Sequence, residues 1–165
     1  MNKNDFAYLR KGNDDIPVEC LNDESKFADL MFSLKNKLKF SDPEILTIWK
    51  IISAILYIGN LEIDISTYDE YKNKPSNIKN KDTLDKISKL FSCNSEALEY
   101  EIMYRTKILD SDRVACNPNE VFTQRDSLAK ALYQSLFSWI VNKLNENLIT
   151  GMNKNVDSKT LFELS

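Results

Sequence analysis

Apolar residues recur at helical spacing over most of the chain, and this pattern predicts a mainly α-helical fold. The first such stretch follows Asn22, a residue type that often caps helix N-termini. Its apolar residues have the i, i+3, i+4, i+7 spacing of one helical face; they are Phe27, Leu30, Met31, Leu34 and Leu38. Only three Gly and four Pro occur in 165 residues, which also favours helices over a turn-rich β architecture.

The segment SDPEILTIWKIISAILYIGN, residues 41–60, predicts a second helix that is apolar nearly all round. Ser41 and Glu44 have the spacing of a capping box, with Pro43 in the first turn. Gly59 is expected to end the helix in a left-handed conformation. Because a helix with apolar residues on most sides must be covered on most sides, we expect this one to be largely buried.

Shorter elements are expected in the middle of the chain. Residues 61–65 alternate like a short strand, whereas the polar residues 66–82 have no period and predict a surface loop. Two short amphipathic helices follow, one over residues 84–91 and one capped by Asn94. The segment RTKILDSDRVACN, residues 105–117, alternates weakly and predicts an exposed hairpin or loop.

Residues 117–148 predict one long helix that is apolar on more than one side. Asn117 as the cap, Pro118 in the first turn and Glu120 form a strong start signal, and Gly151 is expected to end the helix. At about 1.5 Å per residue the helix would span roughly 45–50 Å, whereas a globule of this length is about 30 Å across. In the remaining tail, residues 160–164 are a candidate for the start of a strand.

Composition narrows the chemistry that the chain can perform. The net charge is −3 and the pI about 5.1, so no basic face indicates nucleic-acid binding. The absence of histidine excludes Ser-His and Cys-His nucleophile pairs and His-ligated metals. Cys20, Cys93 and Cys116 form no CxxC pair, so we expect reduced thiols in a cytoplasmic compartment and no zinc site. A polar start and the shortness of the apolar run at 48–59 predict a soluble chain without signal peptide or membrane insertion.

Residue chemistry by itself indicates no catalytic site. Neither GxxxxGK[ST] nor GxGxxG occurs. The acidic pairs Asp14–Asp15 and Asp110–Asp112 could bind a metal or act as acid and base, but solvated loops are the usual place for such residues. The large aromatic residues at helical positions are expected to pack in the core; they are Trp49, Tyr57, Tyr133 and Trp139.

Two long motifs, in this order, resemble the myosin motor domain. The sequence FAYL, the acidic Asp14–Asp15 and an amphipathic helix lead to EILTIWKIISAILYIGNLEI, which is similar to the family's helix ending AILHLGN, with Tyr57 at the usual His. RDSLAKALYQSLFSWIVNKLN, residues 125–145, resembles the family's RDALAKALYxRLFxWLVxxIN, with Ser127 for Ala. The resemblance covers residues 6–148 and implies a mainly α, helical segment of the motor's P-loop α/β fold, with one long helix and a small exposed hairpin.

The resemblance also implies what this segment does not supply. Myosins bind ATP and Mg²⁺ through a phosphate loop and switch I, which precede the corresponding region, and through switch II (DIxGFE), which follows the long helix. None of these motifs occurs here, and the closing LFELS departs from the family's FIGxLDI. We therefore expect residues 1–165 to be a partial motor domain, the upper actin-binding subdomain, with no catalytic residue, no cofactor and no ATPase activity of its own.

Two surface segments would face actin in this family. Residues 66–82 correspond to the loop called loop four, and RTKILDSDRVACN to the hairpin called the cardiomyopathy loop. In the family the residue sixteen before the Asp of the second motif, here Asp126, is acidic or phosphorylatable; in this chain it is Asp110, for which an ordinary acidic turn is the plainer explanation. The resemblance implies seven actin-contacting residues: Lys72, Lys74, Lys107, Asp110, Ser111, Asp112 and Arg113.

The sequence thus favours a segment of an unconventional myosin, an ATP-driven, actin-based motor of the cytoplasm and cytoskeleton. Its partners would be the actin filament and the remaining subdomains of the motor, with no role for nucleic acid or membrane. The alternative is a helical interaction module without motor activity, which binds a partner helix through its apolar faces. A stand-alone enzyme is disfavoured because the chain has neither phosphate loop nor histidine.

Overall fold

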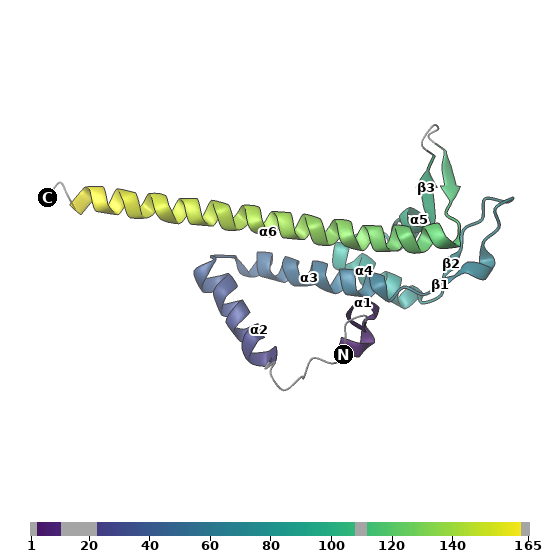
Figure 1. Ribbon diagram of the computed structural model, residues 1–165, viewed down its shortest axis with the longest axis horizontal. Coiled ribbons are helices and arrows are strands. Elements are labelled where there is room, and N and C mark those ends of the chain that lie inside the picture. Colours follow the sequence, from purple (N-terminus) through teal and green to yellow (C-terminus); the bar gives the residue numbers. More distant parts are fainter. Residues whose placement is uncertain (1–2, 11–22, 108–111, 163–165) are drawn as a thin grey trace. The chain divides into compact units, whose positions relative to one another are not determined.

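The computed structural model describes residues 3–10, 23–107 and 112–162, and these are mainly helical, as predicted (Figure 1). The elements follow in chain order: η1 (Lys3–Asp5), α1 (Ala7–Arg10), α2 (Asp23–Phe32), its π-helical continuation η3 (Ser33–Lys37), α3 (Asp42–Gly59), β1 (Ile63–Asp64), η4 (Ile65–Thr67), β2 (Asn77–Ile78), α4 (Lys81–Phe91), α5 (Ser95–Met103), β3 (Tyr104–Thr106), β4 (Arg113–Ala115) and α6 (Pro118–Phe162).

The chain divides into two compact units. The first comprises Met1–Asn13 and Trp49–Tyr133, and the second comprises Asp14–Ile48 and Gln134–Ser165. The helices α3 and α6 contribute residues to both units. Among the described residues, no helix combines the length and apolarity that a membrane crossing requires.

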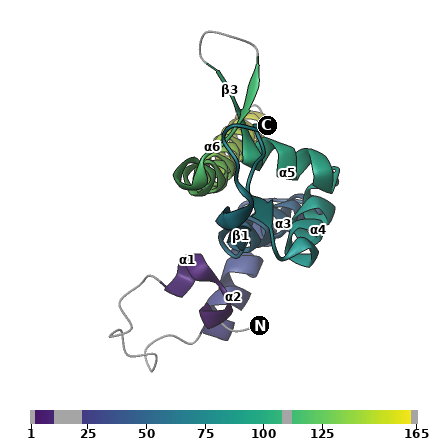
Figure 2. The ribbon, with the colours of Figure 1, turned by 90° about the vertical axis from the view of Figure 1, so that its right-hand side faces the viewer.

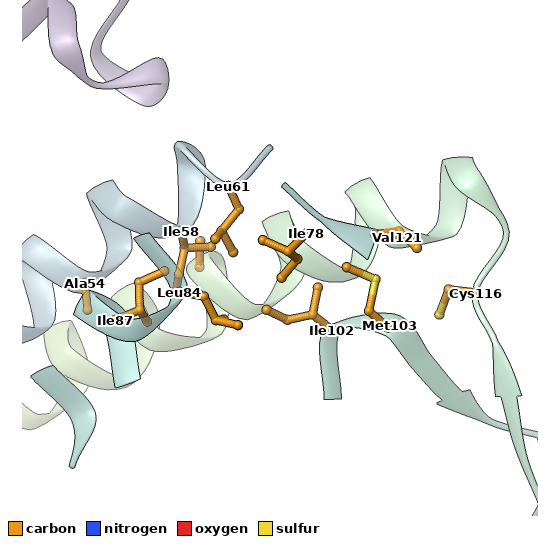
Figure 3. Close-up of a cluster of buried hydrophobic side chains, with 11 residues drawn as sticks. Ala54, Ile58, Leu61, Ile78, Leu84, Ile87, Ile102, Met103, Cys116 and Val121 are labelled. Carbon is orange, nitrogen blue, oxygen red and sulfur yellow. The ribbon is translucent and has the colours of Figure 1, made fainter. Parts of the chain in front are cut away.

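The first unit has a continuous apolar core, to which α3, α4, α5, β2 and the start of α6 contribute (Figure 3). Its buried members are Ala54, Ile58, Leu61, Ile78, Leu84, Ile87, Ile102, Met103, Cys116, Val121 and Ala129. Each large side chain stabilises the fold by about 1.5–3 kcal/mol when it leaves water. This core fixes the short helices and both small sheets against the N-terminal part of α6.

The second unit packs the end of η3 and the start of α3 against the later part of α6. Its buried apolar residues are Leu34, Phe40, Ile45, Ile48 and Leu136. The predicted capping pair forms, because the Glu44 carboxylate accepts hydrogen bonds from the Ser41 N–H and hydroxyl, both at 2.8 Å. Lys143 on α6 forms an ion pair with Glu44 at 2.9 Å, so one carboxylate both starts α3 and holds α6.

The predicted helix start at Asn117 is confirmed. Its side-chain oxygen accepts hydrogen bonds from the N–H groups of Asn119 and Glu120, both at 3.0 Å, and the Glu120 carboxylate accepts from the Asn117 N–H at 2.9 Å. The cap at Asn94 is confirmed in the same way, since its side-chain oxygen accepts from the Ala97 N–H at 3.0 Å.

The first unit contains two small antiparallel sheets. In one, Ile63 pairs with Ile78, so the expected short strand is present but residues 66–82 are not all loop. The prediction missed β2 because a single buried residue, Ile78, carries the strand and gives no period. In the other sheet Tyr104 pairs with Ala115, which settles the open choice between hairpin and loop in favour of a hairpin.

The predictions for two glycines are wrong. Gly59 is the last residue of α3 and does not have a positive φ, so it is not a left-handed cap. It is needed for space, because a Cβ there would lie 2.7 Å from Cδ2 of Tyr8. The helix α6 continues through Gly151 to Phe162, which also excludes a strand starting at 160. One glycine inside a helix costs only about 1 kcal/mol relative to alanine, and no proline follows to stop the helix.

Several residues expected in the core lie at the surface. Tyr133 is 63% exposed in the first unit, and Trp139 is 38% exposed in the second, where its ring packs edge-on against Phe40. Phe137 is 60% exposed, and Leu46 on α3 is 55% exposed. Trp49 and Tyr57 are half-buried. The helical period therefore identified apolar faces correctly, but this chain does not cover all of them.

Candidate functional site

The β3–β4 hairpin projects from the point where α5 ends and α6 begins (Figure 2). Its ladder extends past the strands, because the Lys107 N–H donates to the Asp112 carbonyl at 3.1 Å. Lys107 and Asp112 are both exposed. The other two residues predicted for this hairpin, Asp110 and Ser111, lie outside the described residues.

Arg113, which the resemblance places among the actin-contacting residues, is engaged at the base of the hairpin. Its guanidinium forms an ion pair with Glu101 on α5 and lies over the Tyr100 ring, with 5.4 Å from Cζ to the ring centroid. It also donates to the Tyr104 carbonyl at 3.4 Å. The hydrogen bond to Glu101 raises the pKa of Arg113. These contacts give Arg113 a structural role, because they fix β4 to α5. Its contact with actin stays a prediction.

The opposite strand of the hairpin is tied to α6. Arg105 on β3 forms an ion pair with Glu120 at 3.0 Å, and the same carboxylate caps the start of α6. Arg105 and Glu120 are 44% and 35% exposed, so solvent screens this pair and it contributes little free energy by itself. The ion pair instead fixes the position of β3. Together with the contacts of Arg113, it anchors both strands of the hairpin to neighbouring helices.

The loop before β2 contains a tight turn. Asp69 and Lys74 exchange two backbone hydrogen bonds, both at 2.9 Å. The Asp69 carboxylate accepts from the Lys72 N–H at 3.3 Å and forms an ion pair with the Lys72 ammonium at 3.2 Å. The Lys72 side chain is 79% exposed, and Lys74 is also exposed. The structure therefore presents both predicted lysines on one turn, which we call the 69–74 turn.

Asn73 joins the 69–74 turn to the hairpin. Its side-chain amide donates to the Arg113 carbonyl at 3.3 Å and accepts from the Ala115 N–H at 2.7 Å. Asn73 has a φ of 50°, a left-handed conformation that asparagine adopts more readily than most residues. Sequence reasoning missed Asn73, because an asparagine in a polar loop carries no signal of a distant partner. Through it the two segments predicted to face actin form one surface.

A second polar cluster explains several motif residues in the first unit. The Tyr8 hydroxyl donates to the Asp126 carboxylate at 2.7 Å, and Arg125 donates to the same oxygen through Nε at 2.9 Å and Nη2 at 2.8 Å. Arg125 also reaches the Leu61 carbonyl at 3.4 Å. Asn60 accepts from the Ala7 N–H at 2.8 Å. The cluster thus holds the N-terminal segment and the end of α3 against α6.

The contacts of Tyr8 in this cluster should be visible in how the stability of the protein changes at alkaline pH. Burial, and then the hydrogen bond to Asp126, raise the pKa of Tyr8 from 10.0 to about 12. Because the folded state favours the neutral phenol, Tyr8 contributes stability below pH 10 that is lost as the pH rises towards 12. We expect the free energy of unfolding of the wild type to fall more steeply over this range than that of Tyr8→Phe. Parallel curves for the two proteins would show that the hydroxyl is not held by Asp126.

The described residues contain no group of three or more Cys, Asp or Glu side chains arranged to hold a metal ion. Cys93 is exposed and Cys116 is buried at the end of the hairpin. Burial raises the pKa of the Cys116 thiol, so it stays protonated at neutral pH.

Comparison with known proteins relates residues 1–160 to the family model described as Myosin head (motor domain). Chitin synthase 8 of Mycosarcoma maydis is 32% identical over 146 residues, which cover 87% of this chain and 7% of that protein. Myosin IF heavy chain of Dictyostelium discoideum is 30% identical over 154 residues, 90% of this chain and 14% of that protein. Unconventional myosin-Ib of Rattus norvegicus is 32% identical over 141 residues, 82% of this chain and 12% of that protein. The chain therefore spans only a small part of the length of each relative.

Proposed function

Since the chain belongs to the myosin motor-domain family, we propose that residues 1–165 form the upper actin-binding subdomain of an unconventional myosin. In a complete motor, other parts would bind ATP and Mg²⁺ and hydrolyse the nucleotide. This segment would supply actin-contacting loops, together with helices that relay their movement, and would act with the actin cytoskeleton.

One observation carries the proposal: the hairpin and the 69–74 turn form a single braced surface. Asn73 holds the turn to β4, and Arg113 and Arg105 hold the hairpin to α5 and α6. Lys72, Lys74 and Lys107 extend from this surface into solvent. Exposed ammonium groups on a fixed scaffold suit individual carboxylate groups of a partner, where they increase the association rate and the specificity more than the affinity.

Exposed apolar side chains support the proposal that the remaining subdomains of the motor also bind this segment. Tyr133 in the first unit is 63% exposed and Phe137 in the second is 60% exposed, although both are large apolar residues. Where such side chains belong to a contiguous apolar patch, the patch usually marks a contact with another protein. A helical interaction module without motor activity would use the same faces, so binding to actin distinguishes the two functions.

Co-sedimentation with filamentous actin tests the proposed function. We expect the chain to sediment with filaments at low salt, and to dissociate as the ionic strength approaches physiological values. Replacing Lys72, Lys74 and Lys107 together with alanine should weaken binding, whereas Lys89→Ala, an exposed lysine on α4, should not. A chain that stays in the supernatant but binds an amphipathic helical peptide would favour the interaction module.

The isolated chain should show no saturable binding of ATP with Mg²⁺ in calorimetry. Phosphoryl transfer needs a backbone cradle, a lysine and Mg²⁺ ligands positioned together, and the sequence has no phosphate-loop motif to provide them. A complete myosin motor measured in the same buffer provides the positive control. Micromolar affinity of this chain for the nucleotide would contradict the prediction.

A further inference from the structure

Tyr71 is the most exposed large apolar residue of the described chain. Its exposed fraction is 100%, and it lies in the 69–74 turn next to Lys72. Tyrosine is enriched among the residues that dominate binding energy, since it combines a large apolar ring with a hydroxyl and loses little conformational entropy on binding. A fully solvated ring buries no apolar area in the fold, so it is accessible to another molecule.

The turn keeps its shape without help from the Tyr71 side chain. Asp69 and Lys74 close it through two backbone hydrogen bonds, and the Asn73 N–H donates to the Glu70 carbonyl at 3.2 Å. The Asp69 carboxylate accepts from the Lys72 N–H at 3.3 Å. All of these hydrogen bonds are made by residues on either side of Tyr71 in the turn. The turn therefore holds the backbone at Tyr71 in place, and removing the exposed ring leaves that backbone unchanged.

The side chain of Asn73 fixes where the turn lies. It bonds the carbonyl of Arg113 and the N–H of Ala115, two of the backbone groups that β4 would offer to a further strand. The amide thus replaces one rung of a sheet and attaches the turn to the free edge of the hairpin. As a result, the Tyr71 backbone is part of the same rigid surface as β4.

We propose that Tyr71 is a contact residue for the partner of this surface, and that Asn73 is the positioning residue that holds its turn against β4. The inference rests on the proposed function, in which the partner is the actin filament. A turn whose backbone is fixed before binding loses less entropy when its side chain becomes buried, so both residues strengthen the same contact. Tyr71 supplies the apolar area, and Lys72 and Lys74 beside it supply the charge.

The test measures the dissociation constant of the chain for filamentous actin in four variants. Tyr71→Ala should weaken binding about tenfold, the loss expected for a contact residue of this type, while Tyr71→Phe keeps most of the affinity. Asn73→Gly removes the amide and still tolerates the left-handed φ, and it should also weaken binding. The double variant should bind about as weakly as Tyr71→Ala alone, because both substitutions act through one contact.

Controls separate contact from folding. Asn77→Ala, an exposed asparagine nearby in β2, should leave the dissociation constant unchanged. The melting temperature of Tyr71→Ala should equal that of the wild type, since the ring is fully exposed. If the wild-type chain and Tyr71→Ala bind actin equally well, the inference is wrong but the proposed function stands. Wild-type chain that does not bind actin overturns the proposed function, and the inference with it. Independent, multiplicative effects of the two variants would overturn the positioning role of Asn73.

Discussion

Replacing Gly59 with alanine should destabilise the protein, although alanine is the better helix former. At an ordinary helical position the change would stabilise by about 1 kcal/mol. Here the new Cβ would lie 2.7 Å from Cδ2 and 2.9 Å from Cγ of Tyr8. The ring cannot turn away freely, because its hydroxyl is bonded to Asp126. Overpacking typically costs about 1–3 kcal/mol, so we expect the free energy of unfolding to fall by roughly 1–2 kcal/mol.

Gly59→Ala should stabilise the protein instead of destabilising it when the Tyr8 ring is removed. In a Tyr8→Ala background the space above Gly59 is open, and Gly59→Ala should then raise the free energy of unfolding through helix propensity alone. Urea denaturation of the wild type, both single variants and the double variant measures this coupling. The same change in free energy with and without the Tyr8 ring would show that Gly59 is not kept small by the ring.

Tyr8 and Gly59 also show why local signals were easier to predict than distant contacts. The capping residues Asn94, Asn117 and Glu120 were predicted correctly, because a cap bonds backbone groups within three residues and is encoded where it acts. The glycine was assigned to the wrong role, because its neighbour comes from a segment far away in the sequence. The pattern of apolar residues gave the helices but not their partners.

The candidate surface could be predicted in outline only. The resemblance to a motor family located the two segments, and the structure brings them together. What joins them is one asparagine side chain, and what the turn presents is one tyrosine, neither of which stands out among polar loop residues. Arg113 was expected as an exposed contact, whereas Glu101 and Tyr100 engage its guanidinium. The exposure of a side chain depends on the neighbours that folding brings to it. Local sequence patterns do not identify those neighbours when they are distant in the chain.

Loss of the charge at Asp110 should reduce activation by actin while leaving basal turnover intact. The residue stands in the sequence between β3 and β4, at the position where the resemblance to myosins implies an acid or a regulated phosphate. An aspartate there would make the negative charge permanent, so actin engagement should not require a kinase. A phosphoserine carries nearly two charges, and aspartate is therefore a partial mimic, with Ser111 beside it available for further regulation.

The measurement compares Asp110→Ala with the parent in a complete myosin motor that carries this chain. At low salt, actin-activated ATPase should fall about fivefold, the equivalent of about 1 kcal/mol, and the difference should shrink as salt screens the charge. Asp110→Glu keeps the charge and should keep activation, and Ser111→Ala should resemble the parent. Because Arg113 and Arg105 anchor the base of the hairpin, the substitution should leave that base intact. Actin activation that is equal in Asp110→Ala and the parent would mean that the positional match is accidental and that Asp110 is an ordinary turn residue.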